Sequence, residues 1–289
     1  MSTTPTVAFL GTGLMGGPMA VNVQGAGCPV RGWNRSPEKM AVLVEAGGVA
    51  CASPIDAAEG ADILVTMLAD GPATLAAVQG TLRPGLLWLQ MATVGPEWCD
   101  QLATAAGEAG TRFVDAPVIG SVAPAVSGDL HILASGREGD VDAAAPVFQA
   151  VGVWTQRLGP AGAGQRLKTI FNFWILAQTA LGAEALALAE RLAVGADVFL
   201  QAITGSVADS GYLQTKGPAM VAGTYEPPNF RLRLARKDIA LAVDAAASLG
   251  LELRLGRAAV AAMDVAGAGG FADADFTAVI EATGLRQPG

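Results

Sequence analysis

Two groups of residues stand out for the chemistry that their types and spacing could support. The first is Gly11-Thr12-Gly13-Leu14-Met15-Gly16, a G-x-G-x-x-G pattern that follows the apolar run at 7–10. In that context the first glycine allows a tight turn, the second lets the backbone approach a pyrophosphate, and the third lets a helix pack on the strand. We therefore expect these six residues to bind a dinucleotide at the start of a helix.

The residues about twenty positions further on bear on the identity of the dinucleotide. A site that prefers NAD carries Asp or Glu at the end of the second strand, where the acid holds the ribose hydroxyls. This chain has Asn34-Arg35-Ser36 there, so a guanidinium and a hydroxyl stand where a 2′-phosphate would bind. We predict NADP(H) as the cofactor and these three residues as contacts. The alternative is that Arg35 is a solvated loop residue.

The second group is a lysine and an asparagine four residues apart. Lys168 and Asn172 follow a glycine-rich segment and begin a stretch of helical composition, so they share one face of a predicted helix. An ammonium beside a carbonyl can neutralise the charge that grows during hydride addition and deliver a proton. A place in the first turn and apolar neighbours would lower the proton affinity of Lys168. A surface lysine on a helix is the alternative.

The elements that must position these groups fall into two parts. From residue 6 to about 160, β-rich runs alternate with segments of helical composition, which is typical of βαβ units and a parallel sheet covered on both faces. We predict an α/β Rossmann domain over residues 1–163 and an all-α domain over 164–289, joined by a long interdomain helix. Strands are expected at 7–10, 29–33, 63–67, 86–89, 113–115, 130–133 and 153–156, and helices at 165–194, 196–206, 209–222, 231–249, 255–268 and after Asp273.

Composition narrows the classes of partner. The chain has 289 residues, of which 52% are apolar and 15% charged, and its net charge of -8 repels polyphosphates and anionic lipids. We expect no nucleic-acid or membrane partner, and a mostly buried helix at 171–189 rather than a membrane span. Three scattered cysteines and a single histidine, His131, indicate neither a disulfide framework nor a metal site. The N-terminus shows no signal-peptide pattern, so we expect a cytoplasmic protein.

The chain resembles the β-hydroxyacid dehydrogenase family over almost its entire length. The resemblance rests on the glycine turn, on the segment from Asp115 to Ser121, on the segment from Gly164 to Asn172, and on Lys237-Asp238. It implies that Lys168 is the catalytic acid/base and that Asn172 orients the substrate. It also implies a homodimer or homotetramer, and the alanine-rich helical segments point the same way.

The resemblance assigns further contacts. It implies cofactor contacts from Met67, Leu68, Ala69, Thr93 and Lys237, and substrate contacts around Gly120 and Ser121. The family usually has serine where this chain has Ile119, which suggests a less polar pocket, although the amides of the next two residues can hold an anion. Phe171 adds bulk on the long helix near the expected substrate position.

These patterns predict an NADPH-dependent enzyme that reduces a small aldehyde acid or oxidises a β-hydroxyacid. One alternative is reduction of an imine or a more hydrophobic carbonyl, which would suit Ile119 but would lead us to expect another residue in place of Lys168. A second alternative is an NADP-binding sensor without catalysis, since a fold does not guarantee its usual chemistry.

Overall fold

The structure, a computed structural model, describes residues 4–286 of the chain. The described residues divide into two compact units, and the division falls between Lys168 and Thr169. The boundary predicted at 163/164 coincides instead with the first residues of the long helix α9 (Ala163–Arg191). Each unit has its own hydrophobic core, so each can be described by itself.

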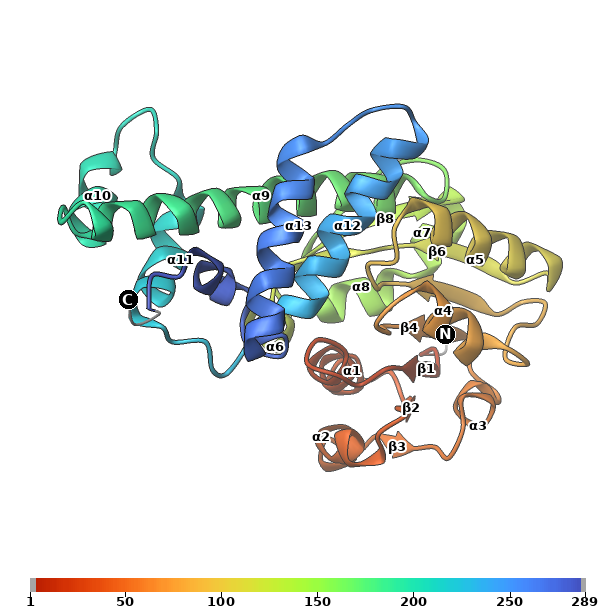
Figure 1. Ribbon diagram of the computed structural model, residues 1–289. Coiled ribbons are helices and arrows are strands. Elements are labelled where there is room, and N and C mark those ends of the chain that lie inside the picture. The colour runs from red at the N-terminus through yellow and green to blue at the C-terminus, as the bar shows by residue number, and fades with distance from the viewer. Residues whose placement is uncertain (1–3, 287–289) are drawn as a thin grey trace. The chain divides into compact units, whose positions relative to one another are not determined.

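The described residues of the first unit form a nine-stranded sheet (Figure 1). Its order is β3-β2-β1-β4-β5-β6-β8-β7, with β9 paired to β8. The strands from β3 to β6 in this order are parallel, whereas β8 runs antiparallel to β6 and β7. The strands are β1 (Val7–Leu10), β2 (Val30–Trp33), β3 (Val49–Ala50), β4 (Ile63–Thr66), β5 (Leu87–Gln90), β6 (Arg112–Asp115), β7 (Val118–Ile119), β8 (Leu130–Gly136) and β9 (Gly152–Arg157).

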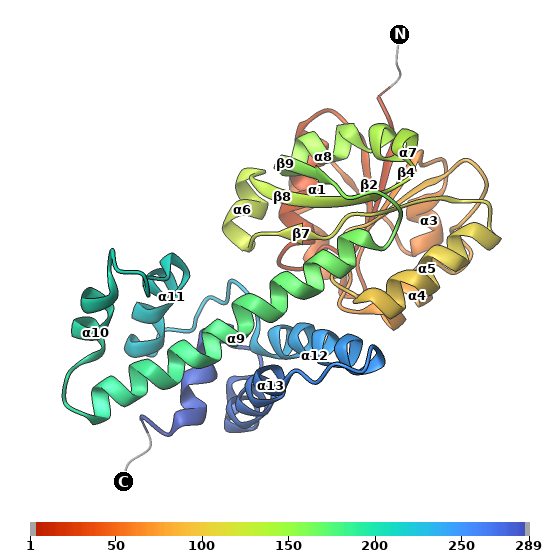
Figure 2. The same ribbon diagram turned by 90° about the horizontal axis from the view of Figure 1, so that it is seen from above.

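Helices cover both faces of this sheet, which confirms the predicted Rossmann arrangement (Figure 2). Val7 and Phe9 of β1 pack with α1 and α8, whereas Ala8 and Leu10 pack with α3 and α5 on the opposite face. This alternation follows from the two-residue period of a strand. The helices are α1 (Gly16–Gly25), η1 (Pro37–Met40), α2 (Ala41–Glu45), α3 (Pro54–Ala58), α4 (Gly71–Val78), α5 (Pro96–Glu108), α6 (Val122–Ser127), α7 (Glu138–Ala143) and α8 (Ala145–Val151).

The order of the parallel strands determines where a ligand binds. The chain reverses direction across the sheet between β1 and β4, so the loops that follow these two strands diverge to opposite faces. Ligands of open parallel sheets bind at such a switch point, outside the carboxyl ends of the strands. The loops after β1, β2, β4 and β5 therefore meet where a dinucleotide is expected.

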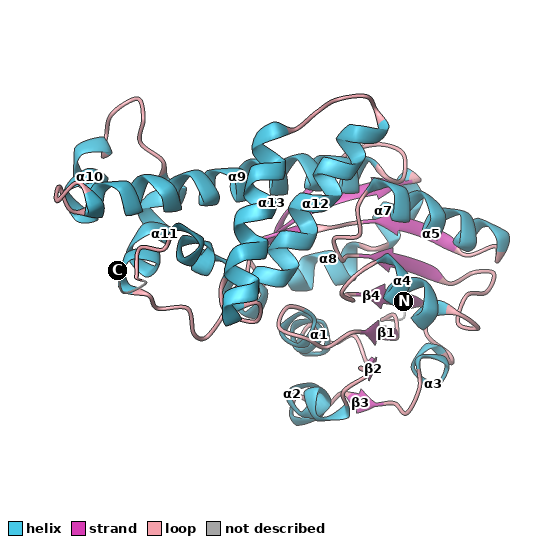
Figure 3. Cartoon of the chain, in the orientation of Figure 1, coloured by secondary structure: helices cyan, strands magenta, loops and turns pink. Residues whose placement is uncertain are grey.

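The regular secondary structure in the described residues of the second unit is helical, apart from an isolated bridge between Arg231 and Asp275 (Figure 3). Its core includes Leu176, Leu186, Ile239 and Met263, all at most 1% exposed. The predicted all-α domain is thus confirmed. Its elements are the later turns of α9, α10 (Ala196–Ile203), α11 (Gly211–Ala222), α12 (Leu232–Ser248), α13 (Arg254–Ala266), η2 (Gly267–Phe271) and η3 (Phe276–Thr283).

Helix α9 carries an exposed apolar stripe, so the expectation of a helix buried on most sides is wrong for the single chain. The stripe consists of large apolar side chains that are between 59% and 68% exposed, namely Ile170, Trp174, Leu181, Leu188 and, just beyond the helix, Leu192. By length and composition alone α9 could cross a membrane, and 39% of its most apolar window is buried. Buried helices of soluble proteins satisfy the same criterion.

Candidate functional site

The turn between β1 and α1 has the shape that a phosphate-binding loop requires. Gly11 has a φ of +99°, and a Cβ atom there would lie 2.4 Å from the backbone oxygen of Met67. A Cβ atom on Gly16 would lie 1.9 Å from the backbone oxygen of Gly11, so α1 packs directly on the turn. At Gly13, by contrast, the Cβ position has no described heavy atom within 4 Å beyond its chain neighbours. The turn therefore fits a pyrophosphate that approaches the backbone at the start of α1.

The loop after β2 is hydrogen-bonded to this turn. The backbone N–H of Thr12 donates to Asn34 Oδ1 at 3.1 Å, and Asn34 Nδ2 donates to the backbone oxygen of Ser36 at 3.0 Å. The Asn34 amide thus holds the two loops together. Arg35 lies between these bonded residues and is exposed, so its guanidinium is accessible to a phosphate.

The other predicted cofactor residues of the first unit lie within the glycine turn or shortly after the carboxyl ends of β4 and β5. Leu10 lies opposite Thr66 in the sheet, and the backbone N–H of Met67 donates to the Leu10 oxygen at 2.9 Å. Thr66 in turn lies opposite Gln90, which places the loop after β5 at the same edge. All six of these predicted cofactor residues are exposed or half-buried, namely Leu14, Met15, Met67, Leu68, Ala69 and Thr93.

The predicted substrate residues after β6 form β7 and the start of α6. Ile119 is half-buried on β7, where it pairs with His131. Gly120 has a φ of +139°, a conformation that favours glycine, and is exposed. Ser121 precedes α6, and its side chain makes no capping hydrogen bond with that helix. The hydroxyl is therefore not used to cap the helix.

Lys168 and Asn172 lie one turn apart on α9 and are both buried, with exposures of 7% and 1%. The helix begins at Ala163, two residues earlier than predicted, so Lys168 lies in the second turn. The predicted place in the first turn is wrong. Because the field of a helix end falls off within about one turn, the helix dipole acts on Lys168 less than predicted. Phe171, on the same helix, is half-buried.

An acid of α12 holds the Asn172 amide. Asn172 Nδ2 donates to Asp238 Oδ2 at 2.7 Å, and Lys237 Nζ lies 2.6 Å from Asp238 Oδ1. Because a carboxylate only accepts, the Asn172 amide must present its nitrogen to Asp238 and direct Oδ1 elsewhere. That oxygen is buried and accepts no hydrogen bond from the described residues. Buried acceptors are seldom unpaired, so this oxygen is a candidate contact for a bound molecule. Lys237, predicted to contact the cofactor, pairs here with Asp238.

A buried carboxylate at the end of β6 was not predicted to have a role. Asp115 is fully buried, and burial raises its pKa from 3.8 to about 6, although hydrogen bonds from Gln165 and Ser135 oppose the shift. Asp115 and Asp238 both stand in segments that carry the family resemblance, yet neither was assigned a function. The signal that could have revealed Asp115 is a charged residue at the end of an apolar strand.

Comparison with protein-family models matches almost the whole chain. Residues 6–159 match the NAD binding domain of 6-phosphogluconate dehydrogenase. Residues 162–283 match the NAD-binding domain of NADP-dependent 3-hydroxyisobutyrate dehydrogenase. The two matches meet near the start of α9.

Individual proteins are similar over the same length. The 3-sulfolactaldehyde reductase of Escherichia coli is 33% identical over 281 residues, which cover 95% of this chain and 94% of that protein. Glyoxylate/succinic semialdehyde reductase 1 of Arabidopsis thaliana is 33% identical over 282 residues, covering 96% and 97%. The structure of Mycobacterium tuberculosis 3-hydroxyisobutyrate dehydrogenase with L-serine has a TM-score of 0.88 at 31% identity and covers 98% of this chain and 100% of its own.

The glycine turn, the buried lysine and asparagine of α9, and these matches agree in both units. The predicted family and the oxidoreductase class are confirmed. The chain belongs to the β-hydroxyacid dehydrogenase family of nicotinamide-dependent oxidoreductases.

Proposed function

We propose that this protein uses NADPH to reduce a small aldehyde that carries an anionic group, or oxidises the corresponding β-hydroxyacid, with Lys168 as acid/base. The observation that carries the proposal is the buried pair of Lys168 and Asn172 one turn apart on α9. Burial removes water from around the amine, which strengthens its interaction with the charge that develops on a carbonyl oxygen. The names of the relatives support the substrate class, because glyoxylate and succinic semialdehyde carry a carboxylate and sulfolactaldehyde a sulfonate.

Each residue has a defined part in the proposed reaction. When bound, NADPH supplies the hydride that adds to the carbonyl carbon. Lys168 gives a proton to the carbonyl oxygen as negative charge develops there, and takes that proton back in the oxidation. Asn172 Oδ1 accepts a hydrogen bond from the substrate. The backbone N–H groups of Gly120 and Ser121 bind the anionic group of the substrate.

Arg35 supports NADPH over NADH. It is exposed in the loop after β2, and the residues directly after that strand, Asn34 to Ser36, include no acid of the kind that holds the ribose hydroxyls in NAD sites. The planar guanidinium suits a bidentate contact with a 2′-phosphate.

Ile119 supports a second candidate function, the reduction of an imine or an apolar carbonyl. It places an aliphatic side chain where the family resemblance leads us to expect a serine hydroxyl. Lys168 favours the first candidate, because protonation of a carbonyl oxygen requires an acid at that position.

A panel of substrates tests both candidates. We expect NADPH oxidation with glyoxylate, succinic semialdehyde or sulfolactaldehyde, and slower turnover with uncharged aldehydes and cyclic imines. Lys168→Met should lower kcat by at least about a hundredfold and leave NADPH binding nearly unchanged. The matched control is Arg166→Met, a nearby cation of α9 that is exposed and paired with Asp100 at 3.2 Å. Full activity of Lys168→Met excludes the acid/base role, and no turnover of any substrate favours a sensor.

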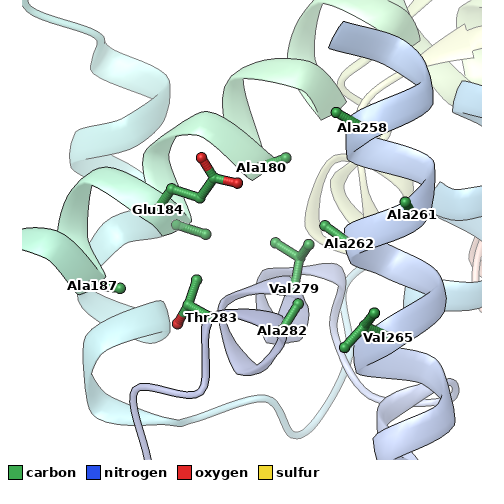
Figure 4. Close-up of a pocket in the computed structure, with 11 residues that line it drawn as sticks. Ala180, Glu184, Ala187, Ala258, Ala261, Ala262, Val265, Val279, Ala282 and Thr283 are labelled. Carbon is green, nitrogen blue, oxygen red and sulfur yellow. The ribbon is translucent and has the colours of Figure 1, made fainter. Parts of the chain in front are cut away.

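We also propose that a second copy of the chain covers α9. Within the second unit an apolar groove of about 480 Å³ is lined by alanines of α9 and α13, including Ala180, Ala187, Ala258 and Ala262 (Figure 4). On the same helix, Leu181 and Leu188 directly follow the groove residues Ala180 and Ala187 in sequence, and their side chains are 68% and 59% exposed. A twofold interface can be built from an apolar groove and projecting apolar side chains on one helix, because Leu181 and Leu188 of each copy can enter the groove of the other. A free-standing chain would expose this stripe to water.

A further inference from the structure

The start of α9 is held by side chains of two strands rather than by its own residues. Asp115 Oδ2 accepts the backbone N–H of Gln165 at 2.8 Å and the hydroxyl of Ser135 at 3.1 Å. The same Ser135 hydroxyl accepts the backbone N–H of Gly164 at 3.0 Å. Two N–H groups of the first helical turn, which have no partners inside a helix, are therefore satisfied by β6 and β8.

The contact between these strands and the helix leaves no spare room. A Cβ atom on Gly164 would lie 2.4 Å from the backbone oxygen of Leu133 and 2.8 Å from Asp115 Oδ2. Glycine at 164 thus lets the helix approach the strand ends closely enough for the hydrogen bonds to form.

The side chain of Gln165 extends this network to the loop after β5. Its Oε1 accepts the backbone N–H groups of Val94 at 3.1 Å and Gly95 at 3.2 Å. Its Nε2 donates to the backbone oxygen of Ala92 at 2.8 Å and to Asp115 Oδ1 at 3.1 Å. A flipped amide would set donors against donors and acceptors against acceptors, so only one orientation satisfies all four groups. Gln165 is fully buried, which makes an unsatisfied group there costly.

Two predicted functional residues lie directly on the segments that this network joins. Thr93 is between Ala92 and Val94, both of which are bonded to Gln165. Lys168 follows Gln165 by three residues on α9. All of these residues belong to the first compact unit.

We propose that Asp115 and Gln165 are positioning residues, which fix the loop carrying Thr93 to the helix carrying Lys168 so that hydride and proton transfer share one geometry. The inference rests on the function proposed above. Neither residue needs to touch the substrate, because each acts through the backbone of its neighbours. A displacement of about 1 Å in such a scaffold is enough to lower a rate about a hundredfold.

Two variants and one control test this proposal. Gln165→Met keeps the length of the side chain and removes its four hydrogen bonds. Asp115→Asn keeps the shape and sets a donor against Gln165 Nε2. The control is Thr111→Val, at the residue just before β6, the strand that ends at Asp115. It removes two partly buried hydrogen bonds, which the Thr111 hydroxyl makes with the backbone N–H and the backbone oxygen of Arg83, both at 2.9 Å. It lowers stability away from the network.

The readouts are kcat, the KM for the aldehyde and hydrogen exchange of the backbone N–H groups at 92–95. We expect both variants to lower kcat about tenfold or more, with KM changed by less than about threefold. Exchange at 92–95 should accelerate beyond the change that the global stability explains. Thr111→Val should show neither effect. Should Gln165→Met fail to fold, Ser135→Ala, which removes the contacts of the Ser135 hydroxyl with Asp115 and Gly164, should show smaller effects of the same kind.

Two results would overturn the proposal: exchange at 92–95 that stays as slow as in the unaltered protein, or a kcat that falls no further than in Thr111→Val. Hydrogen exchange and NADPH titration can be measured without any turnover of substrate, so they remain informative if no aldehyde is reduced. If the unaltered protein reduces no aldehyde, the proposed function fails while the exchange measurement still decides whether Gln165 holds the loop.

Discussion

Asp238 and Asn172 form a buried hydrogen bond of 2.7 Å that joins α12 to α9. The bond determines which end of the Asn172 amide faces the acid, and it leaves Oδ1 as a buried acceptor without a partner among the described residues. The proposed contact of Asn172 with the substrate therefore depends on Asp238, a residue that acts through its neighbour.

Asp238→Ala should lower kcat/KM for the aldehyde by roughly 10- to 100-fold, which corresponds to the 1–3 kcal/mol of a buried polar group that has lost its partner. Asp238→Asn can still present an oxygen to Asn172 and should retain more of the activity. Steady-state kinetics of both variants, with NADPH titrations as the control for cofactor binding, make the comparison. Equal losses in the two variants would show that the charge opposite Lys237 matters and the orientation of Asn172 does not.

Burial of Asp115 predicts a pH dependence of stability with a definite sign. Its pKa is raised from 3.8 to about 6, so the folded protein binds this proton more tightly than the unfolded chain. The favourable contribution is complete below about pH 4 and is lost as pH rises through about 6. A shift of this size corresponds to about 3 kcal/mol.

The neighbouring groups do not obscure this effect. Burial is the largest of several causes that raise the pKa of the Cys99 thiol, so the thiol stays neutral throughout the pH range in which Asp115 titrates. The side chains of Ser135 and Gln165, which bond to Asp115, do not titrate. The charged Asp100 and Arg166 are paired with each other nearby. Urea unfolding between pH 4 and pH 7.5 should show the unaltered protein losing stability relative to Asp115→Asn as pH rises. A difference that stays constant, or that grows in favour of the unaltered protein, contradicts the prediction.

The sheet could be predicted from the sequence where its strands are continuous apolar runs. The runs that became β1, β4 and β5 are buried on both faces, so they carry a signal in every residue. β3 and β7 have two residues each, too few for any periodicity. The start of α9 was missed because Ala163-Gly164 resembles the end of a glycine-rich linker, whereas Gly164 is needed for close packing.

The site was predictable where its residues are neighbours in the chain. The glycine turn and the spacing of Lys168 and Asn172 are visible within a few positions. The partners that position them are not, because Asp115 is 50 residues from Gln165, and Asn172 is 66 residues from Asp238. Such pairs are created by the topology of the sheet and by helix packing, which a single sequence does not display.

Cofactor preference should depend on Arg35. Arg35→Asp removes a charge-assisted contact with the 2′-phosphate and adds repulsion, so it should weaken NADPH binding far more than NADH binding. Arg137→Asp, at another exposed arginine of the first unit, makes the same change of net charge before α7 and serves as the control. Fluorescence titrations with both cofactors measure the effect, and an unchanged preference in Arg35→Asp removes the support for NADPH.

Ile119 should limit how well an anionic substrate is held. Ile119→Ser introduces a hydroxyl beside Gly120 and Ser121, and a new hydrogen bond to a charged group contributes about 1.5–3 kcal/mol. We expect the KM for glyoxylate or succinic semialdehyde to fall about tenfold or more, with less effect on uncharged aldehydes. A KM that falls equally for charged and uncharged aldehydes would show that the pocket does not bind the anionic group at this position.

Association through α9 should depend on its apolar stripe. Trp174, Leu181 and Leu188 are seven residues apart, so they lie on one face of the helix, and each is at least 59% exposed. Leu181→Asp and Leu188→Asp together place two charges in the proposed interface, where they would lose hydration without gaining a partner. Sedimentation should show the unaltered protein as a dimer or larger and the double variant shifted toward the monomer. Val207→Asp, at an exposed loop position of the second unit, is the control and should leave assembly unchanged. An unaltered protein that sediments as a monomer, or a double variant that remains fully assembled, would place the interface elsewhere or exclude it.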